Sequence, residues 1–153
     1  MTIGTVPTIN IGQPLEPIRY VFNLMPRPKD RPRSFVAGGR VVNTTTPRTR
    51  WYENQIMQGA SLQHPFAGPL EGDLWIIINF TLPTRVHGDL DNLAKSVLDG
   101  MQGVAFKNDK QIKALSLAIF FDKKSTGQIE VIIQHHNSTP PEAELEVGNE
   151  FEE

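Results

Sequence analysis

LWIIINFTL at residues 74–82 is the stretch of sequence that decides the fold. Its first residues are apolar without interruption and its last residues alternate with polar ones, as in the central strand of a sheet. Residues 83–88 break the strand, and apolar residues then recur at helical spacing from Asp91 to Met101. Gly103 is expected to end this helix. The sequence therefore predicts a central strand followed by an amphipathic helix.

A strand and a hairpin are predicted near the N-terminus. Residues 18–25 alternate like a strand that ends at a proline. Residues 34–36 and 40–42 are expected to pair through a tight turn, because a Gly-Gly pair stands between them. This hairpin follows directly on a proline-rich segment.

A helix is expected after the hairpin. Thr46 is a suitable N-cap, and Pro47 suits the first helical position, so the helix should run to about Ala60. Trp51 and Tyr52 fall within it and are expected to be core residues, although exposed aromatic rings could also stack on bases.

Two further alternating segments, residues 115–121 and 129–133, are expected to form a second hairpin. The order strand, hairpin, helix, strand, helix, strand, strand then indicates an α+β fold, with a mixed β-sheet and helices packed on one face. The chain has 153 residues, of which 39% are hydrophobic. That length can bury one core but is short for two, so a small single domain is expected.

Composition excludes several classes of protein. The chain has no cysteine, so a disulfide framework and a thiolate metal site are excluded. No apolar run approaches the length of about eighteen residues that a membrane span needs, and a soluble cytoplasmic protein without a membrane partner is expected. We divide the chain into an N-terminal extension (1–17), a domain (18–136) and a tail (137–153). The tail has six glutamates and no basic residue, which predicts disorder.

A basic segment is hidden within a net charge of −2. Between residues 19 and 50 eight basic residues face one acid, Asp30, a local charge of +7. Prolines alternate with bases at residues 27–33, which favours a stiff, extended segment whose side chains point outward to phosphates. A basic segment of this kind indicates either a surface that binds nucleic acid or a charged surface that is only solvated. The candidate DNA-binding residues are Arg27, Lys29, Arg31, Arg33, Arg40, Arg48 and Arg50.

The motif DLDNLAK, which begins at Asp89, groups two carboxylates and a lysine at one helix start. Asp89 is expected at the N-cap and Asp91 in the first turn, where the helix dipole favours negative charge. Lys95 and Asp99 follow on the same side of the helix. A turn after the helix can return Asp109 to a place beside Asp91. Carboxylate oxygens suit Mg²⁺, which takes its other ligands from water and phosphate, so phosphoryl-transfer chemistry is indicated.

A purely structural interpretation of these residues stays open. An Asp-x-Asp pair before a helix often supplies only a cap and first-turn charge, and an Asn-Asp pair is often only a turn. Asp91, Lys95 and Asp99 could be solvated pairs on an exposed helix face, which Asn92 and Ser96 are expected to share. The conjunction of all these groups favours the metal site.

The stretch at residues 89–121 resembles the RusA family of Holliday-junction resolvases. That family's signature is Asp-x-Asp-Asn-x-x-Lys, then a helix with a Leu-Asp pair, then a short acidic turn before a strand. Here the later elements are Leu98-Asp99 and Asn108-Asp109. Many members have two acids at the turn, where this chain has one.

A looser likeness to the family extends over residues 18–135. The family often has a basic residue directly before the first aspartate, whereas this chain has Gly88 there and Arg85 three residues earlier.

The resemblance implies a small homodimeric endonuclease that cuts four-way DNA junctions symmetrically with Mg²⁺, for which Mn²⁺ can substitute. It implies that Asp89, Asp91 and Asp109 are the metal ligands and that Lys95 is the essential lysine. These four are the expected catalytic residues. Asn92 and Asp99 are expected to support them, with Asp99 orienting the lysine.

The expected function is phosphodiester hydrolysis by a metal-bound water in DNA recombination and repair, with no small-molecule cofactor. The protruding hairpin is suited to enter the open centre of a junction. Two alternatives remain from the residues alone. One is a non-catalytic dimer that binds branched DNA and whose aspartates are helix caps. The other is a metal-dependent phosphohydrolase acting on nucleotides.

Overall fold

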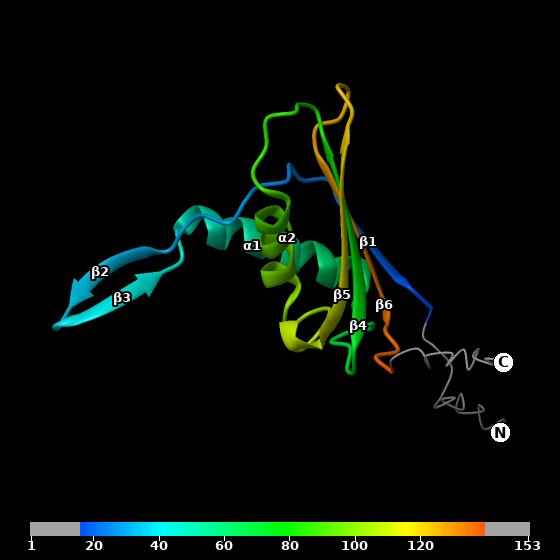
Figure 1. Ribbon diagram of the computed structural model, residues 1–153, viewed down its shortest axis with the longest axis horizontal. Coiled ribbons are helices and arrows are strands. Elements are labelled where there is room, and N and C mark those ends of the chain that lie inside the picture. Colours follow the sequence, from blue (N-terminus) through cyan, green and yellow to red (C-terminus); the bar gives the residue numbers. More distant parts are fainter. Residues whose placement is uncertain (1–15, 140–153) are drawn as a thin grey trace, which may run out of the picture.

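The computed structural model describes residues 16–139 and shows two helices on one face of a four-stranded sheet (Figure 1). The sheet contains β1 (Ile18–Phe22), β4 (Leu74–Leu82), β5 (Ile112–Phe121) and β6 (Gln128–His135). The helices are α1 (Pro47–Gln63) and α2 (Leu90–Met101), and a short 3-10 helix, η1, covers Asp109–Gln111. The predicted α+β fold, with a mixed sheet and helices on one face, is confirmed.

β4 is the central strand, and the sheet order is β1-β6-β4-β5. It runs parallel to β5, to which α2 connects it, and antiparallel to β6. The predicted hairpin between residues 115–121 and 129–133 is wrong, because those segments lie on opposite edges of β4. Alternation shows that a segment is a strand but does not show its partner. A buried strand needs hydrogen-bond partners along both edges, and β4 obtains them from β5 and β6.

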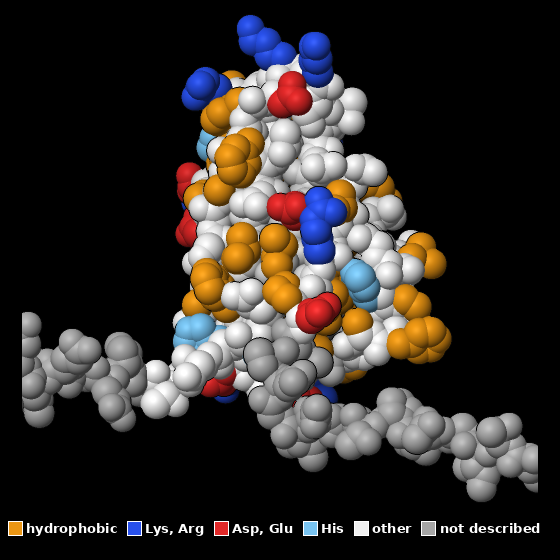
Figure 2. All heavy atoms as spheres, turned by 90° about the vertical axis from the view of Figure 1, so that its right-hand side faces the viewer, with side chains coloured by type: hydrophobic (Ala, Val, Ile, Leu, Met, Phe, Trp, Pro, Cys, Tyr) orange, Lys and Arg blue, Asp and Glu red, His pale blue; other side chains and the backbone are white. Residues whose placement is uncertain are grey.

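The core lies between the sheet and the helices. Alternate residues of β4, from Leu74 to Phe80, are buried in one cluster with the inner residues of α1, α2, β1 and β6. The other residues of β4, such as Trp75 and Ile77, are only half-buried, since no helix from residues 16–139 covers their side of the sheet. Figure 2 faces this side and shows apolar side chains scattered among charged ones.

One ion pair crosses this uncovered side. Arg19 Nε donates to Glu130 Oε2 at 2.6 Å, and Asn79 Nδ2 donates to Glu130 Oε1 at 2.9 Å. The hydrogen bond from Asn79 and then the one from Arg19 hold the pKa of Glu130 below its usual range.

α1 begins where the sequence predicts. Thr46 is the N-cap, and its hydroxyl accepts a hydrogen bond from the backbone N–H of Thr49 at 3.3 Å. Tyr52 is buried as expected, but the prediction for Trp51 is wrong, since Trp51 is 55% exposed. The buried residues of α1 recur every three or four positions, and Trp51 falls between them. An exposed ring is therefore present near the basic start of α1.

α1 and α2 pack closely at Gly100. A Cβ at Gly100 would lie 2.7 Å from Ile56 Cβ and 2.9 Å from the carbonyl oxygen of Glu53. Glycine therefore allows α2 to approach α1 more closely than any other residue would. α2 ends at Met101, and Gly103 follows with a φ of 89°, as the sequence predicts.

The first predicted hairpin is confirmed as β2 (Arg33–Ala37) and β3 (Arg40–Thr44). Gly38 and Gly39 form its turn with φ values of 57° and 73°, which favour glycine. The two strands form a sheet of their own and project from the body of the molecule (Figure 1).

No helix within residues 16–139 is long and apolar enough to cross a membrane. Most of the predicted N-terminal extension and of the acidic tail lies outside these described residues.

Candidate active site

The start of α2 presents two exposed carboxylates. Asp89 is the N-cap residue, as predicted, and its backbone oxygen accepts from the N–H of Leu93 at 2.9 Å. Its side chain makes no capping hydrogen bond. Asp91 follows in the first turn, where Oδ1 accepts from the N–H of Asn92 at 2.9 Å. Both side chains are exposed, so they keep oxygens available for an external ligand.

Gly88, directly before these residues, packs against the proline-rich segment. A Cβ at Gly88 would lie 2.8 Å from Pro28 Cβ. A larger residue does not fit there without moving Pro28.

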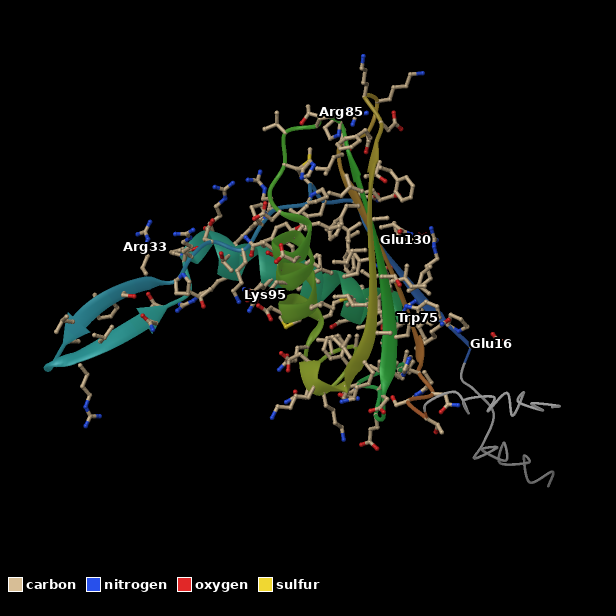
Figure 3. All side chains as sticks on the ribbon, in the orientation of Figure 1. Glu16, Arg33, Trp75, Arg85, Lys95 and Glu130 are labelled. Carbon is tan, nitrogen blue, oxygen red and sulfur yellow. The ribbon has the colours of Figure 1, made fainter. Side chains whose placement is uncertain are left out.

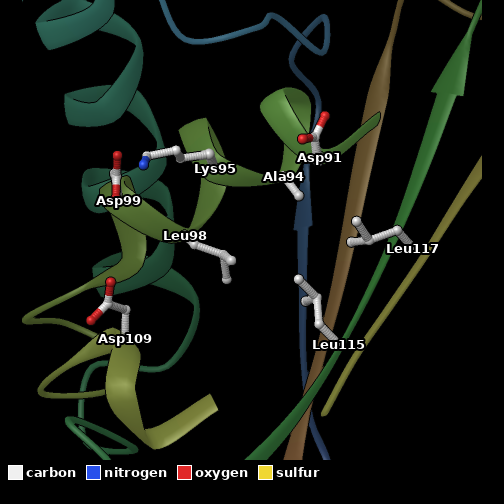
Figure 4. Close-up of a pocket in the computed structure, with 8 residues that line it drawn as sticks. All are labelled: Asp91, Ala94, Lys95, Leu98, Asp99, Asp109, Leu115 and Leu117. Atoms are coloured by element: carbon white, nitrogen blue, oxygen red, sulfur yellow. The ribbon is translucent and has the colours of Figure 1, made fainter. Parts of the chain in front are cut away.

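A pocket of about 240 Å³ lies between α2 and β5 (Figure 4). Its apolar lining comes from Ala94 and Leu98 of α2 and from Leu115 and Leu117 of β5. Its polar lining consists of Asp91, Lys95, Asp99 and Asp109. The structure thus brings four of the five predicted charged residues to one pocket, whereas Asp89 does not line it.

Asp109 is held in place by a capping box around η1. Asn108 Oδ1 accepts from the N–H of Lys110, and Gln111 Oε1 accepts from the N–H of Asn108, both at 2.9 Å. Gln111 Nε2 also donates to the carbonyl oxygens of Leu70 and Gly72. Asn108 therefore serves as the N-cap of η1. Our sequence analysis missed Gln111, although the Asn-x-x-Gln spacing was its signal.

Lys29 does not point outward, so that prediction is wrong. Its Nζ pairs with Asp99 Oδ2 on α2 and lies 3.3 Å from Glu53 Oε1 on α1. Burial alone would lower the pKa of Lys29, but the hydrogen bond and attraction of Asp99, together with Glu53, outweigh it and raise this pKa. Asp99 is therefore the ion-pair partner of Lys29. No ion pair within residues 16–139 joins Asp99 to Lys95. The expectation that Asp99 orients Lys95 stays a prediction.

A family model, Endodeoxyribonuclease RusA, matches residues 23–134. The match spans the fold, the DLDNLAK motif and the turn that carries Asp109. The chain belongs to the RusA family. No curated protein sequence matches it significantly. Membership of RusA makes the protein a DNA-cleaving hydrolase, of a family that generally depends on a divalent metal.

The carboxylates of this RusA protein do not form a closed set of three metal ligands. Asp91 lies near the start of α2, whereas Asp109 lies beyond its other end, near Asp99 (Figure 4). Eight residues of helix rise by about 12 Å, so Asp91 and Asp99 are two turns apart. Within residues 16–139 no three His, Cys, Asp or Glu side chains are grouped to hold a metal ion. The predicted place of Asp109 beside Asp91 is wrong, because α2 runs on before the chain turns back.

The pair Asp89 and Asp91 still fits a Mg²⁺ ion. This ion commonly uses one or two carboxylates and completes its octahedron with waters and substrate phosphates. The two residues are exposed, two positions apart, and their side chains are not used to cap α2. The assignment of all three aspartates as ligands stays a prediction.

A second pocket, of about 390 Å³, adjoins the first on the side of the basic segment. It is lined by Lys29, Asp30, Arg31, Pro32, Asn92 and Lys95. Asn92 Nδ2 donates to the backbone oxygen of Lys29 at 3.2 Å and so fastens the segment to α2. Lys95 lines both pockets, and Figure 3 shows it pointing to the side of α2 from which the hairpin projects.

The six predicted DNA-binding arginines of this RusA chain are all exposed. They come from the proline-rich segment, the hairpin and the first turn of α1, and they are Arg27, Arg31, Arg33, Arg40, Arg48 and Arg50. The proline-rich segment is attached to α1, because the N–H of Arg27 donates to the Tyr52 hydroxyl at 3.2 Å. Burial raises the pKa of Tyr52 to about 12.

Proposed function

We propose that this protein is a Mg²⁺-dependent endonuclease that resolves four-way DNA junctions by phosphodiester hydrolysis, in recombination and repair. The observation that carries the proposal is the position of Lys95. This exposed lysine borders both the acidic pocket and the pocket beneath the basic segment. A DNA strand held by the arginines can therefore place a phosphate at Lys95 and next to the carboxylates.

Asp89 and Asp91 are the residues proposed to hold the divalent ion, and Mn²⁺ is expected to substitute. Such an ion, when bound, lowers the pKa of a bound water and supplies a nucleophile. The family resemblance assigns Asp109 as the third ligand, and Asp109 lines the same pocket as Asp91.

Lys95 is an exposed residue and has no ion-pair partner within the described part of the chain. It is therefore available to bind a phosphate oxygen. Negative charge that builds up on the reacting phosphate in the transition state is stabilised by such a cation. The arginines bind the neighbouring phosphates and hold the strand in place.

A homodimer is part of this proposal. Resolving a four-way junction takes two cuts in strands related by a two-fold axis, and a two-fold symmetric dimer supplies two sites in that relation. Light scattering of the purified protein measures the mass, and a monomer at the concentrations that give cleavage would contradict this part.

The decisive test compares a labelled four-way junction with a linear duplex of the same sequence, with Mg²⁺ and with EDTA. Wild-type protein is expected to cut only the junction and only with Mg²⁺. Asp91→Asn should bind the junction but not cut it, and Asp122→Asn, in the β5–β6 turn, is the matched control that should cut normally. Binding without cutting under all conditions would instead support a non-catalytic binder. Hydrolysis of free nucleotides would support the phosphohydrolase, and nucleotide binding should then depend only weakly on salt, because few phosphates are contacted.

Two further variants test the individual roles. Asp109→Asn is expected to lose cleavage, and cleavage at the wild-type rate would remove Asp109 from the ligand set. Lys95→Ala should lower the single-turnover rate much more than affinity, since its contact strengthens in the transition state. Lys123→Ala, also in the β5–β6 turn, is the control. A loss of affinity at an unchanged single-turnover rate would limit Lys95 to binding.

A further inference from the structure

The β2–β3 hairpin stands apart from the rest of the molecule. Its two strands pair with each other and with no other strand within residues 16–139, and every residue of β2 is exposed. Figures 1 and 3 show it extending well beyond the ends of the helices. A two-stranded hairpin is marginally stable alone in water, so this one needs a partner surface.

The end of the hairpin is apolar on both of its faces. Val36 pairs with Val41 next to the turn, and Phe35 pairs with Val42 one position further back. Neighbouring residues of a strand point to opposite faces, so the two pairs lie on opposite sides of the hairpin. Phe35 is 50% exposed, Val36 73% and Val41 70%. A hairpin that docked on a flat protein surface would need only one apolar face, whereas insertion between two layers uses both.

Positive charge lies at both ends of the hairpin, with Arg40 beside the turn and Arg33 at the base, where it pairs with Thr44. Arg33 begins β2, Arg40 begins β3, and Arg31 lies just before the hairpin. Two copies of the hairpin that met at their apolar ends would bring these like charges together, which is unfavourable. DNA instead offers phosphates for the arginines and flat apolar base faces for the end of the hairpin.

We infer that the apolar end of this hairpin inserts at the branch point of a junction, between base pairs that have lost a stacking neighbour. Phe35 stacks on a base on one side, and Val36 with Val41 covers a base on the other. A linear duplex keeps its base pairs stacked and offers no such opening, so insertion gives selectivity for branched DNA. This inference rests on the proposed function and adds the feature that selects the substrate.

The test measures binding to a four-way junction and to the matching duplex in EDTA, where no cleavage occurs. Phe35→Ser and the double variant Val36→Ser, Val41→Ser are compared with Arg33→Ala as the matched control. Each apolar variant should bind the junction about tenfold more weakly, the loss expected for one stacked base, with duplex binding unchanged. Arg33→Ala should weaken both equally. A 2-aminopurine base beside the branch point should change in fluorescence on binding wild-type protein, and not on binding Phe35→Ser.

Three outcomes would overturn the inference. Equal losses for junction and duplex would limit the hairpin to non-selective contacts. Unchanged binding by both apolar variants would remove the hairpin from recognition. A lower mass of the apolar variants than of the wild-type protein in light scattering would show that the hairpin joins two copies of the chain. The substituted residues lie outside the core, so the variants are expected to fold. Circular dichroism and thermal unfolding verify this.

The same measurements separate this inference from the proposed function. If wild-type protein neither prefers nor cuts the junction, the proposed function fails. If wild-type protein cuts the junction and the apolar variants keep the full preference for it, only the role of the hairpin fails.

Discussion

Lys29→Met is the perturbation whose result the structure predicts most sharply. Lys29 joins the proline-rich segment to Asp99 of α2 and Glu53 of α1. The substitution keeps much of the side-chain length but removes the charge. Both carboxylates then lose their cation in a partly buried place, so the free energy of unfolding should fall.

The size of the loss follows from how far these side chains are buried. Lys29 is 22% exposed, Glu53 23% and Asp99 27%. Breaking a fully buried pair costs about 3–5 kcal/mol, whereas an exposed pair contributes about 0–1 kcal/mol. We therefore expect Lys29→Met to lower the free energy of unfolding by about 2 kcal/mol. Lys29→Arg, which keeps the charge, should recover part of it.

Urea denaturation followed by circular dichroism measures this loss. Lys107→Met is the matched control, because Lys107 and its partner Glu71 are both largely exposed, and the midpoint should hardly move. The pKa of Lys29 is raised in the folded protein, so its contribution is complete below the unfolded pKa of about 10.4. The contribution disappears as the pH rises through the folded pKa, and the gap between wild type and Lys29→Met should close only there.

DNA binding gives the result that would refute this reasoning. Because Lys29 is engaged within the protein, the salt dependence of junction binding should keep its slope in Lys29→Met. A slope smaller by about one unit, together with an unchanged free energy of unfolding, would show that Lys29 contacts a phosphate and that the ion pairs are unimportant.

Three further outcomes follow from particular contacts. Gly100→Ala should lower the free energy of unfolding, because a clash of about 1–3 kcal/mol with Ile56 outweighs a gain of about 1 kcal/mol in helix propensity; a higher midpoint in urea would contradict this. The pKa of Glu130 is lowered, so its contribution exists above the unfolded pKa and is lost as the pH falls through the folded one; Glu130→Gln should be less stable at pH 7, and the difference should disappear once the pH is below the folded pKa, as acid titration of the unfolding midpoint would show. Arg31→Ala should reduce the salt slope of junction binding by about one unit, and an unchanged slope would place Arg31 away from the phosphates.

Local sequence determined the elements and much of their chemistry. The largely apolar stretch at residues 74–82 predicted the central strand, the Gly-Gly pair predicted the hairpin turn, and Thr46 and Pro47 predicted the start of α1. Asp89 and Asp91 took the positions at the start of α2 that their charge favours. These features depend on interactions within a few residues, which a linear pattern contains.

The tertiary structure alone decided which elements are neighbours and what each charge contacts. Alternation did not reveal that β5 and β6 lie on opposite edges of β4, because strand pairing depends on the whole sheet. Spacing did not reveal that Asp99 pairs with Lys29, seventy residues away, or that Asp109 lies on the side of Asp99 and not beside Asp91. The physical reason is the same in each case: the partner of a charge or of a strand edge is set by packing between segments that are distant in sequence, and a local pattern holds no record of that packing.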